Sequence, residues 1–104
     1  MPLTNTIRDT VCARAQSDQA FVKALLTEAM NAYLSGDEAT GKTILRDVVH
    51  STIGFPHLGE ALGKSIKSLH RMLGPSGNPN TTNFFAIFQV LQQVVGVRLV
   101  VEAA

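Results

Sequence analysis

The sequence predicts an all-α domain of five to six helices followed by a short C-terminal β-strand. Apolar residues recur at steps of three and four along most of the chain, and turns rich in glycine, proline or asparagine separate these runs. Hydrophobic residues make up 45% of the 104 residues, a content too high for a disordered chain. At this length we expect residues 1–104 to form a single domain with N-terminal helices in residues 1–53.

Three helices are expected in the first 53 residues. Ile7, Val11 and Ala15 follow helical spacing, with Thr4 or Asn5 as a candidate cap. A second helix begins after Asp18 as N-cap and ends near Gly36; its apolar positions are Phe21, Leu25, Ala29, Met30 and Tyr33. A third helix begins at Asp37 and ends near Gly54, with Ile44, Leu45, Val48 and Val49 as its apolar positions.

Two short helices separated by Gly63 follow. Pro56 suits the first turn of a helix over residues 55–62, and Ser65 suits the N-cap of a helix that reaches Leu73. The turn formers of residues 74–79 predict a loop. A last helix begins at about residues 80–82 and ends at Gly96.

Residues 97–101 have the composition of a short strand. A lone strand leaves its backbone groups unpaired and therefore needs a partner. An irregular segment of the same chain, a second subunit or another protein could supply it.

The charge of the chain is distributed unevenly. Residues 1–60 carry five basic and seven acidic side chains, whereas residues 61–104 carry Lys64, Lys67, Arg71 and Arg98 against Glu102 alone. The net charge is only +1, but the second half suits contact with phosphates.

The helix after Ser65 has one cationic and one apolar face. At about 100° per residue, Lys64, Lys67, Ser68 and Arg71 share one face, while Leu69, Met72 and Leu73 share another. Leu58, Gly59 and Leu62 supply apolar or small residues where the preceding helix would touch it. Residues 54–101 therefore predict a helix-turn-helix that binds DNA, with its second helix in the major groove.

The candidate DNA-binding residues divide by role. Lys67 and Arg71 can donate to guanine, Ser65 and Ser68 can bond base edges or phosphates, and Ile66 could contact a thymine methyl. The free N–H groups at the start of this helix could bind a phosphate. We expect Lys64, His70, Asn78 and Asn80 to contact the backbone and set the register.

In this pattern the chain resembles the lambda-repressor-like, or XRE-type, helix-turn-helix family over residues 54–101. The matching positions are Leu58-Gly59, Gly63, Ser65, Leu69, Arg71, Gly77-Asn78-Pro79 and the closing Leu91 with Gly96-Val97. One position departs from the family: Phe55 stands where the second helix often begins with a glutamine that supports phosphate or base contact.

A narrower resemblance extends upstream to about residue 20. Ala32-Tyr33-Leu34, Leu45-Arg46-Asp47-Val48-Val49 and Ser68-Leu69-His70-Arg71-Met72-Leu73 look like segments of the addiction-module antidote proteins. The resemblance implies an antitoxin that pairs with a small toxin similar to the RelE/HigB ribonucleases and represses the shared operon.

Other chemistries find less support in the sequence. The histidines at 50, 57 and 70 lack zinc spacing, Cys12 is the only cysteine, and no nucleophile–base set is present, so we expect no metal, no cofactor and no enzymatic activity. The spacing of Phe84, Phe85 and Phe88 favours core packing over a base-stacking platform. No apolar run approaches the roughly 20 residues of a membrane span, and no secretory signal is apparent, so we expect a cytoplasmic protein.

The sequence thus favours a sequence-specific DNA-binding repressor, acting as a homodimer on an operator and serving as the antitoxin of a type II toxin–antitoxin module. The alternative is a protein-interaction module that neutralises a partner toxin without useful DNA binding of its own. The low net charge and Phe55 keep this alternative open.

Overall fold

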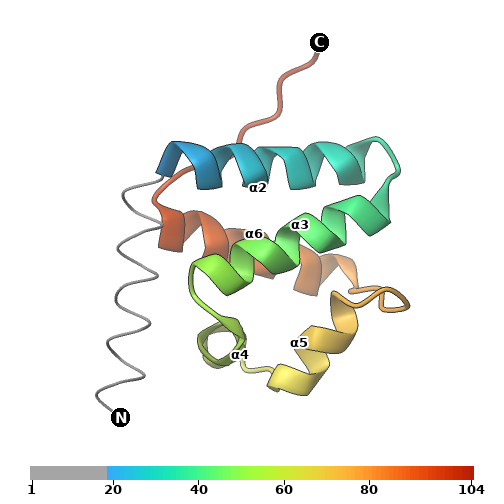
Figure 1. The fold of residues 1–104 in the computed structure, drawn as a ribbon, viewed down its shortest axis with the longest axis vertical. Coiled ribbons are helices and arrows are strands. Elements are labelled where there is room, and N and C mark those ends of the chain that lie inside the picture. Colours follow the sequence, from blue (N-terminus) through green and yellow to red (C-terminus); the bar gives the residue numbers. More distant parts are fainter. Residues whose placement is uncertain (1–18) are drawn as a thin grey trace.

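The computed structural model describes residues 19–104, which contain five α-helices and no strand. The helices are α2 (Gln19–Leu34), α3 (Glu38–Ser51), α4 (Phe55–Leu62), α5 (Ile66–Met72) and α6 (Thr81–Val95) (Figure 1). The predicted all-α class is confirmed. The helix expected near residues 4–15, the Asp18 cap and Cys12 lie outside the described residues.

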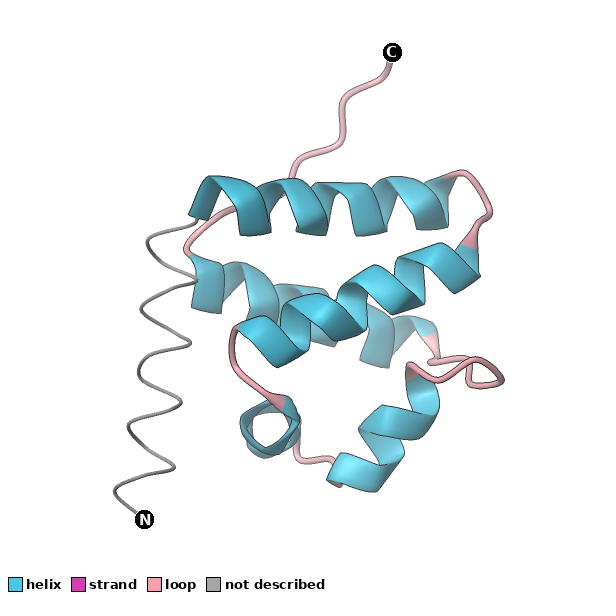
Figure 2. Ribbon diagram, viewed as in Figure 1, coloured by secondary structure: helices cyan, strands magenta, loops and turns pink. Residues whose placement is uncertain are grey.

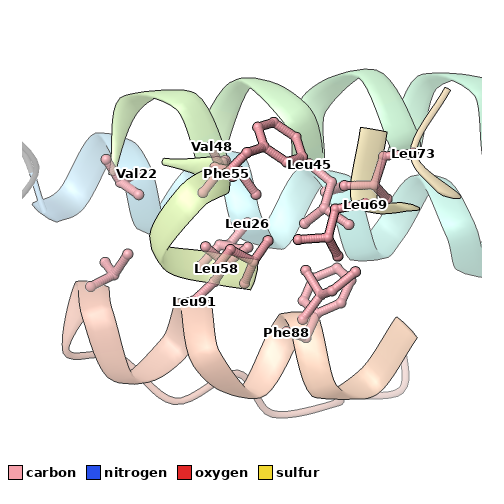
Figure 3. Packing of buried hydrophobic residues seen from close by; sticks show 14 residues of the cluster. Val22, Leu26, Leu45, Val48, Phe55, Leu58, Leu69, Leu73, Phe88 and Leu91 are labelled. Carbon is pink, nitrogen blue, oxygen red and sulfur yellow. The ribbon is translucent and has the colours of Figure 1, made fainter. Parts of the chain in front are cut away.

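The helices are arranged around one core. α2 and α3 pack along one another, α6 passes behind α3, and α4 and α5 lie on the side away from α2 (Figures 1 and 2). Side chains from all five helices meet between them (Figure 3). The buried apolar residues are Val22, Leu26, Ala29, Leu45, Val48, Val49, Phe55, Leu58, Leu69, Leu73, Ile87, Phe88, Leu91 and Val95.

Side-chain caps and left-handed glycines set the helix boundaries. Asp37 caps α3, Ser65 caps α5 as predicted, and Asn80 caps α6, each accepting a hydrogen bond from a backbone N–H three residues later. Hydrogen bonds from the side chain and backbone of Thr40 lower the pKa of the Asp37 carboxyl. Gly63 and Gly96 follow α4 and α6 with φ of 65° and 80°, the left-handed conformation that glycine adopts freely.

The aromatic residues at the start of α6 pack mainly inward. Phe88 is buried, and Phe84 is half-buried with its ring edge-on to Tyr33 at a centroid distance of 4.6 Å. Burial raises the pKa of the Tyr33 hydroxyl to about 12. Core packing is confirmed for Phe84 and Phe88, whereas Phe85 remains 51% exposed.

The strand predicted for residues 97–101 does not form; this segment is irregular and leads away beyond α2 (Figure 1). Its N-terminal part is held by Gln92, whose carbonyl accepts from the Val97 N–H at 3.0 Å and whose Oε1 accepts from the Leu99 N–H at 2.7 Å. The physical reason is the absence of a pairing strand anywhere in residues 19–104.

The turn between α4 and α5 brings their backbones into close contact. The Lys64 N–H donates to the Gly59 carbonyl at 2.9 Å, and a Cβ on Gly59 would lie 2.6 Å from the Lys64 carbonyl oxygen. Leu58 and Leu69, fully buried, join the two helices to the core. α4 is seen nearly end-on while α5 lies across the view, so the helices cross steeply (Figure 2). The structure therefore confirms Gly59 as the small residue at the contact between α4 and α5.

A buried lysine fastens the loop that follows α5. Lys42 of α3 is 8% exposed, and its Nζ donates to the Gly77 carbonyl at 2.7 Å. Gly77 in turn lies against the C-terminal end of α5, where a Cβ would overlap the Arg71 carbonyl. The position of α5 is thus fixed at its start by Gly59 and at its end by the Lys42–Gly77 hydrogen bond.

The Gly59 contact predicts that Gly59→Ala destabilises the fold by about 1–3 kcal/mol, because the added methyl meets backbone and forces the helices apart. The free energy of unfolding from urea titration, followed by circular dichroism, measures this. Gly63→Asn is the control: nothing lies within 4 Å of its added Cβ, and asparagine tolerates left-handed backbone, so the change should stay below about 1 kcal/mol. Unchanged stability of Gly59→Ala would contradict the tight turn.

The Lys42 contact predicts that Lys42→Met lowers stability by about 1–3 kcal/mol, because a charge-assisted hydrogen bond is lost and the Gly77 carbonyl keeps no protein donor. The same substitution at exposed Lys64 should change stability by less than about 0.5 kcal/mol. Thermal unfolding of both variants tests this, and equal effects would show that the Lys42 ammonium does not anchor the loop.

Candidate nucleic-acid interface

α5 separates into the two faces that its sequence predicts. Leu69 and the following Leu73 are fully buried, and Met72 is half-buried. Lys64, Lys67 and Arg71 are exposed on the other side. Burying Leu69 alone stabilises the docking of α5 by about 1.5–3 kcal/mol, so the apolar face determines which side chains remain available to a ligand.

The available face carries cations that form no ion pair within residues 19–104. In the described part of the chain the recorded ion pair is His57 with Glu60, whose atoms Nδ1 and Oε2 lie 3.4 Å apart on α4. No carboxylate of residues 19–104 lies within ion-pair distance of Lys64, Lys67 or Arg71. These three side chains can therefore approach a polyanion without first breaking an internal pair.

One of the backbone N–H groups at the start of α5 is already bonded to the N-cap residue, Ser65. The Ser65 hydroxyl accepts from the Ser68 N–H at 3.0 Å, which leaves the Ser65 O–H as a donor. One N–H of the first turn is thus already satisfied, and α5 has only seven residues. Ile66 is 45% exposed beside this turn.

His70 is exposed, but its ring also packs against the core residue Phe55. Its ring stacks on that of Phe55 with centroids 4.2 Å apart and an interplanar angle of 22°, and His50 of α3 meets Phe55 edge-on at 4.9 Å. Phe55 itself is 2% exposed. Phe55 therefore serves the core and the seating of α5, and cannot replace a glutamine as a ligand contact.

The two asparagines lie in a different environment from the cations of α5. Asn80 uses its Oδ1 to cap α6, accepting from the Asn83 N–H at 2.8 Å. Asn78 lines a shallow hollow of about 270 Å³ together with Glu38, Tyr33 and Phe85. Because Glu38 would repel phosphate, Lys64, Ser65, Ile66, Lys67, Ser68 and Arg71 form the coherent part of the predicted site.

Sequence reasoning missed two features that position this site. The Phe55–His70 stack joins residues fifteen positions apart and follows no helical spacing. Lys42 resembles any other helix-surface lysine until the loop that it holds is known. The available signal was weak: Lys42 falls three residues before Leu45, on the side of α3 that its apolar residues mark as buried.

Other chemistries find no site in residues 19–104. No group of three or more His, Cys, Asp or Glu side chains converges there in a way that could hold a metal ion. None of the described helices has the length and apolar character needed to cross a membrane.

No protein-family model matches the sequence, and no solved structure shows a significant match to the chain. The site consists of a short helix docked by its apolar face, with cations on its outward face that form no ion pair within residues 19–104.

Proposed function

We propose that this protein is a sequence-specific DNA-binding transcriptional repressor and that α5 is its recognition helix. The observation that carries the proposal is a set of exposed cations without a carboxylate partner in the described residues: Lys64 in the turn before α5, and Lys67 and Arg71 on α5, which packs across α4. Such a helix is short enough and cationic enough to enter the major groove of DNA.

The residues of α5 take different roles in this proposal. Lys67 and Arg71 read bases by donating to guanine O6 and N7, and Ile66 contacts a thymine methyl. Lys64 binds the phosphate backbone, with the Ser65 hydroxyl as a further donor. His70 supports the helix through its stack on Phe55.

We further propose that the repressor acts in the cytoplasm as a homodimer on a two-fold operator and is the antitoxin of a toxin–antitoxin module that regulates its own operon. Two-fold operators pair with two-fold proteins, since each copy reads one half-site. The toxin partner, a small ribonuclease similar to RelE/HigB, comes from the antidote-protein resemblance alone.

A protein-interaction module without useful DNA binding is the second candidate. The buried Phe55 favours it, since the glutamine contact of the resembling family has no counterpart here. The net charge of +1 favours it as well. In the first function α5 binds DNA, and in the second it does not. Substitutions on α5 that change DNA affinity therefore distinguish the two functions.

Lys67→Ala combined with Arg71→Ala should weaken binding to a DNA site, selected from a random-sequence pool, by at least about 100-fold, because each base contact contributes roughly 1–3 kcal/mol. The free energy of unfolding should change by less than about 1 kcal/mol, since both side chains are exposed. Mobility-shift titration measures the affinity. Glu28→Ala, at an exposed charged residue of α2 on the far side of the molecule from α5, is the control and should leave the affinity unchanged (Figure 1). Unchanged affinity of the double variant would overturn the recognition-helix assignment.

DNA affinity should fall as salt rises, with a log–log slope of about −1 or steeper for each protomer, because Lys64 neutralises a phosphate. Lys64→Ala should reduce the slope by about 1 and weaken selected and unrelated DNA equally, because it contacts phosphate and not bases. Fluorescence anisotropy over a salt series measures both. Binding that does not respond to salt, or no binding at all, would favour the interaction module.

A further inference from the structure

Two backbone N–H groups of the segment after α6 are hydrogen-bonded to α6, and the backbone groups of its even-numbered residues have no bond within residues 19–104. The N–H groups of Val97 and Leu99 both donate to Gln92, to its carbonyl oxygen and its Oε1 respectively. In an extended chain the N–H and C=O groups of alternate residues point to opposite sides. The N–H groups of Val97 and Leu99 thus face α6, and in an extended pairing the even-numbered residues Arg98, Val100 and Glu102 would present their backbone groups, the free edge of the tail, to a second strand.

The free edge is also unusually apolar for an exposed segment. Val100 is 74% exposed and Val101 85% exposed, and no hydrogen bond within residues 19–104 involves the backbone groups of Arg98, Val100 or Glu102. An edge of this kind is a template for a further β-strand. Residues 97–101, predicted as a strand, therefore have exposed apolar side chains. Their even-numbered residues also have backbone groups that could pair with another strand.

We infer that residues 97–103 pair with the same residues of a second copy of this chain, as a two-fold antiparallel ribbon centred on Val100. Val100 then faces Val100 of the second copy, and the even-numbered positions exchange about six backbone hydrogen bonds through the free edge. The contacts to Gln92 are kept in both copies, because they use only the opposite edge.

Charge selects this register among those that the free edge allows. Centred on Val100, the ribbon places Arg98 of each copy opposite Glu102 of the other, which gives two attractive cross-strand pairs. Centring on position 98 would face Arg98 with Arg98, and centring on position 102 would face Glu102 with Glu102. The same segment thus supplies both partners of each ion pair, as a self-complementary interface requires.

A groove lies beside the segment that would pair. It has a volume of about 250 Å³, and it is lined by residues of α2, including Met30 and Leu34, and by residues 98–102 of the tail. In the proposed register Val101 of the second copy lies beside Leu99. Pairing would cover Leu34, which is otherwise 66% exposed.

The ribbon is the interface of the homodimer that the proposed function requires and in that respect rests on it, but no residue of α5 takes part in the ribbon. The two can fail separately. A dimer that binds no DNA would contradict the repressor proposal but not the ribbon. A protein that binds DNA and whose tail variants remain dimeric would contradict the ribbon but not the repressor proposal.

A charge-swap series tests the ribbon on the full-length chain without DNA. Arg98→Glu alone places a new carboxylate opposite Glu102 at both ends of the ribbon, and Glu102→Arg alone places a new guanidinium opposite Arg98 at both ends. Each single variant should therefore raise the dimer Kd by roughly tenfold or more. The double variant restores both pairs with the signs exchanged and should return the Kd to near the wild-type value. Sedimentation equilibrium measures all four proteins, and circular dichroism confirms that each remains folded.

Cysteine cross-linking tests the register itself. In a Cys12→Ser background, Val100→Cys should form an intermolecular disulfide on oxidation, because paired Cα atoms lie about 5.5 Å apart. Val101→Cys, at the more exposed neighbour, should not, because its paired position is residue 99. A monomeric wild-type protein, a double charge variant that is not rescued, or equal cross-linking at both positions would each overturn the inference.

Discussion

The close approach of Gly59 to Lys64 is the contact on which the geometry of this protein depends. A backbone hydrogen bond of 2.9 Å joins the two residues, and there is no room for a side chain at Gly59. Gly63 reverses the chain between them in the left-handed conformation. With α4 and α5 held this closely, Leu69 enters the core and the cationic residues before and after it turn outward. The cationic surface of α5 is thus a consequence of a steric constraint in the preceding helix.

Local physics made most of the fold predictable. Pro56 and Gly63 bracket α4, and its bounds of Phe55–Leu62 agree with the expectation, because both residues restrict the backbone irrespective of tertiary context. The two faces of α5 follow from spacing in the same way. Contacts between distant segments were not predictable: the Lys42–Gly77 hydrogen bond spans 35 residues, and the Phe55–His70 stack depends on how two helices cross. The strand failed for a related reason, since strand composition cannot show whether a partner is present.

The distribution of charge explains how a nearly neutral chain could bind a polyanion. At physiological salt, screening limits the range of the interaction between exposed charges to about 8–10 Å. The acidic side chains of distant helices therefore contribute little to the potential at the surface of α5. What a phosphate would meet locally is Lys64, Lys67 and Arg71, with Glu60 at the end of α4 as a nearby acid that is not ion-paired to them. Asn78 lines the same hollow as Glu38. The negative charge of Glu38 makes the surroundings of Asn78 less favourable for a phosphate than the surface of α5. Net charge is therefore a poor guide here, and the set of neighbours within one screening length is the relevant quantity.

In the proposed function, α5 would contact DNA and the C-terminal tail would join two copies of the protein. A seven-residue helix offers few base contacts, so one copy alone would bind DNA weakly and with little specificity. Joining two copies makes the second contact intramolecular and raises the effective affinity without any new base contact. The tail beyond Gln92 has the free backbone edge and the self-complementary charges to make that connection, and it lies beyond α2, away from α5. A partner protein that paired with this same edge would compete with the second copy and thereby reduce DNA binding without touching α5.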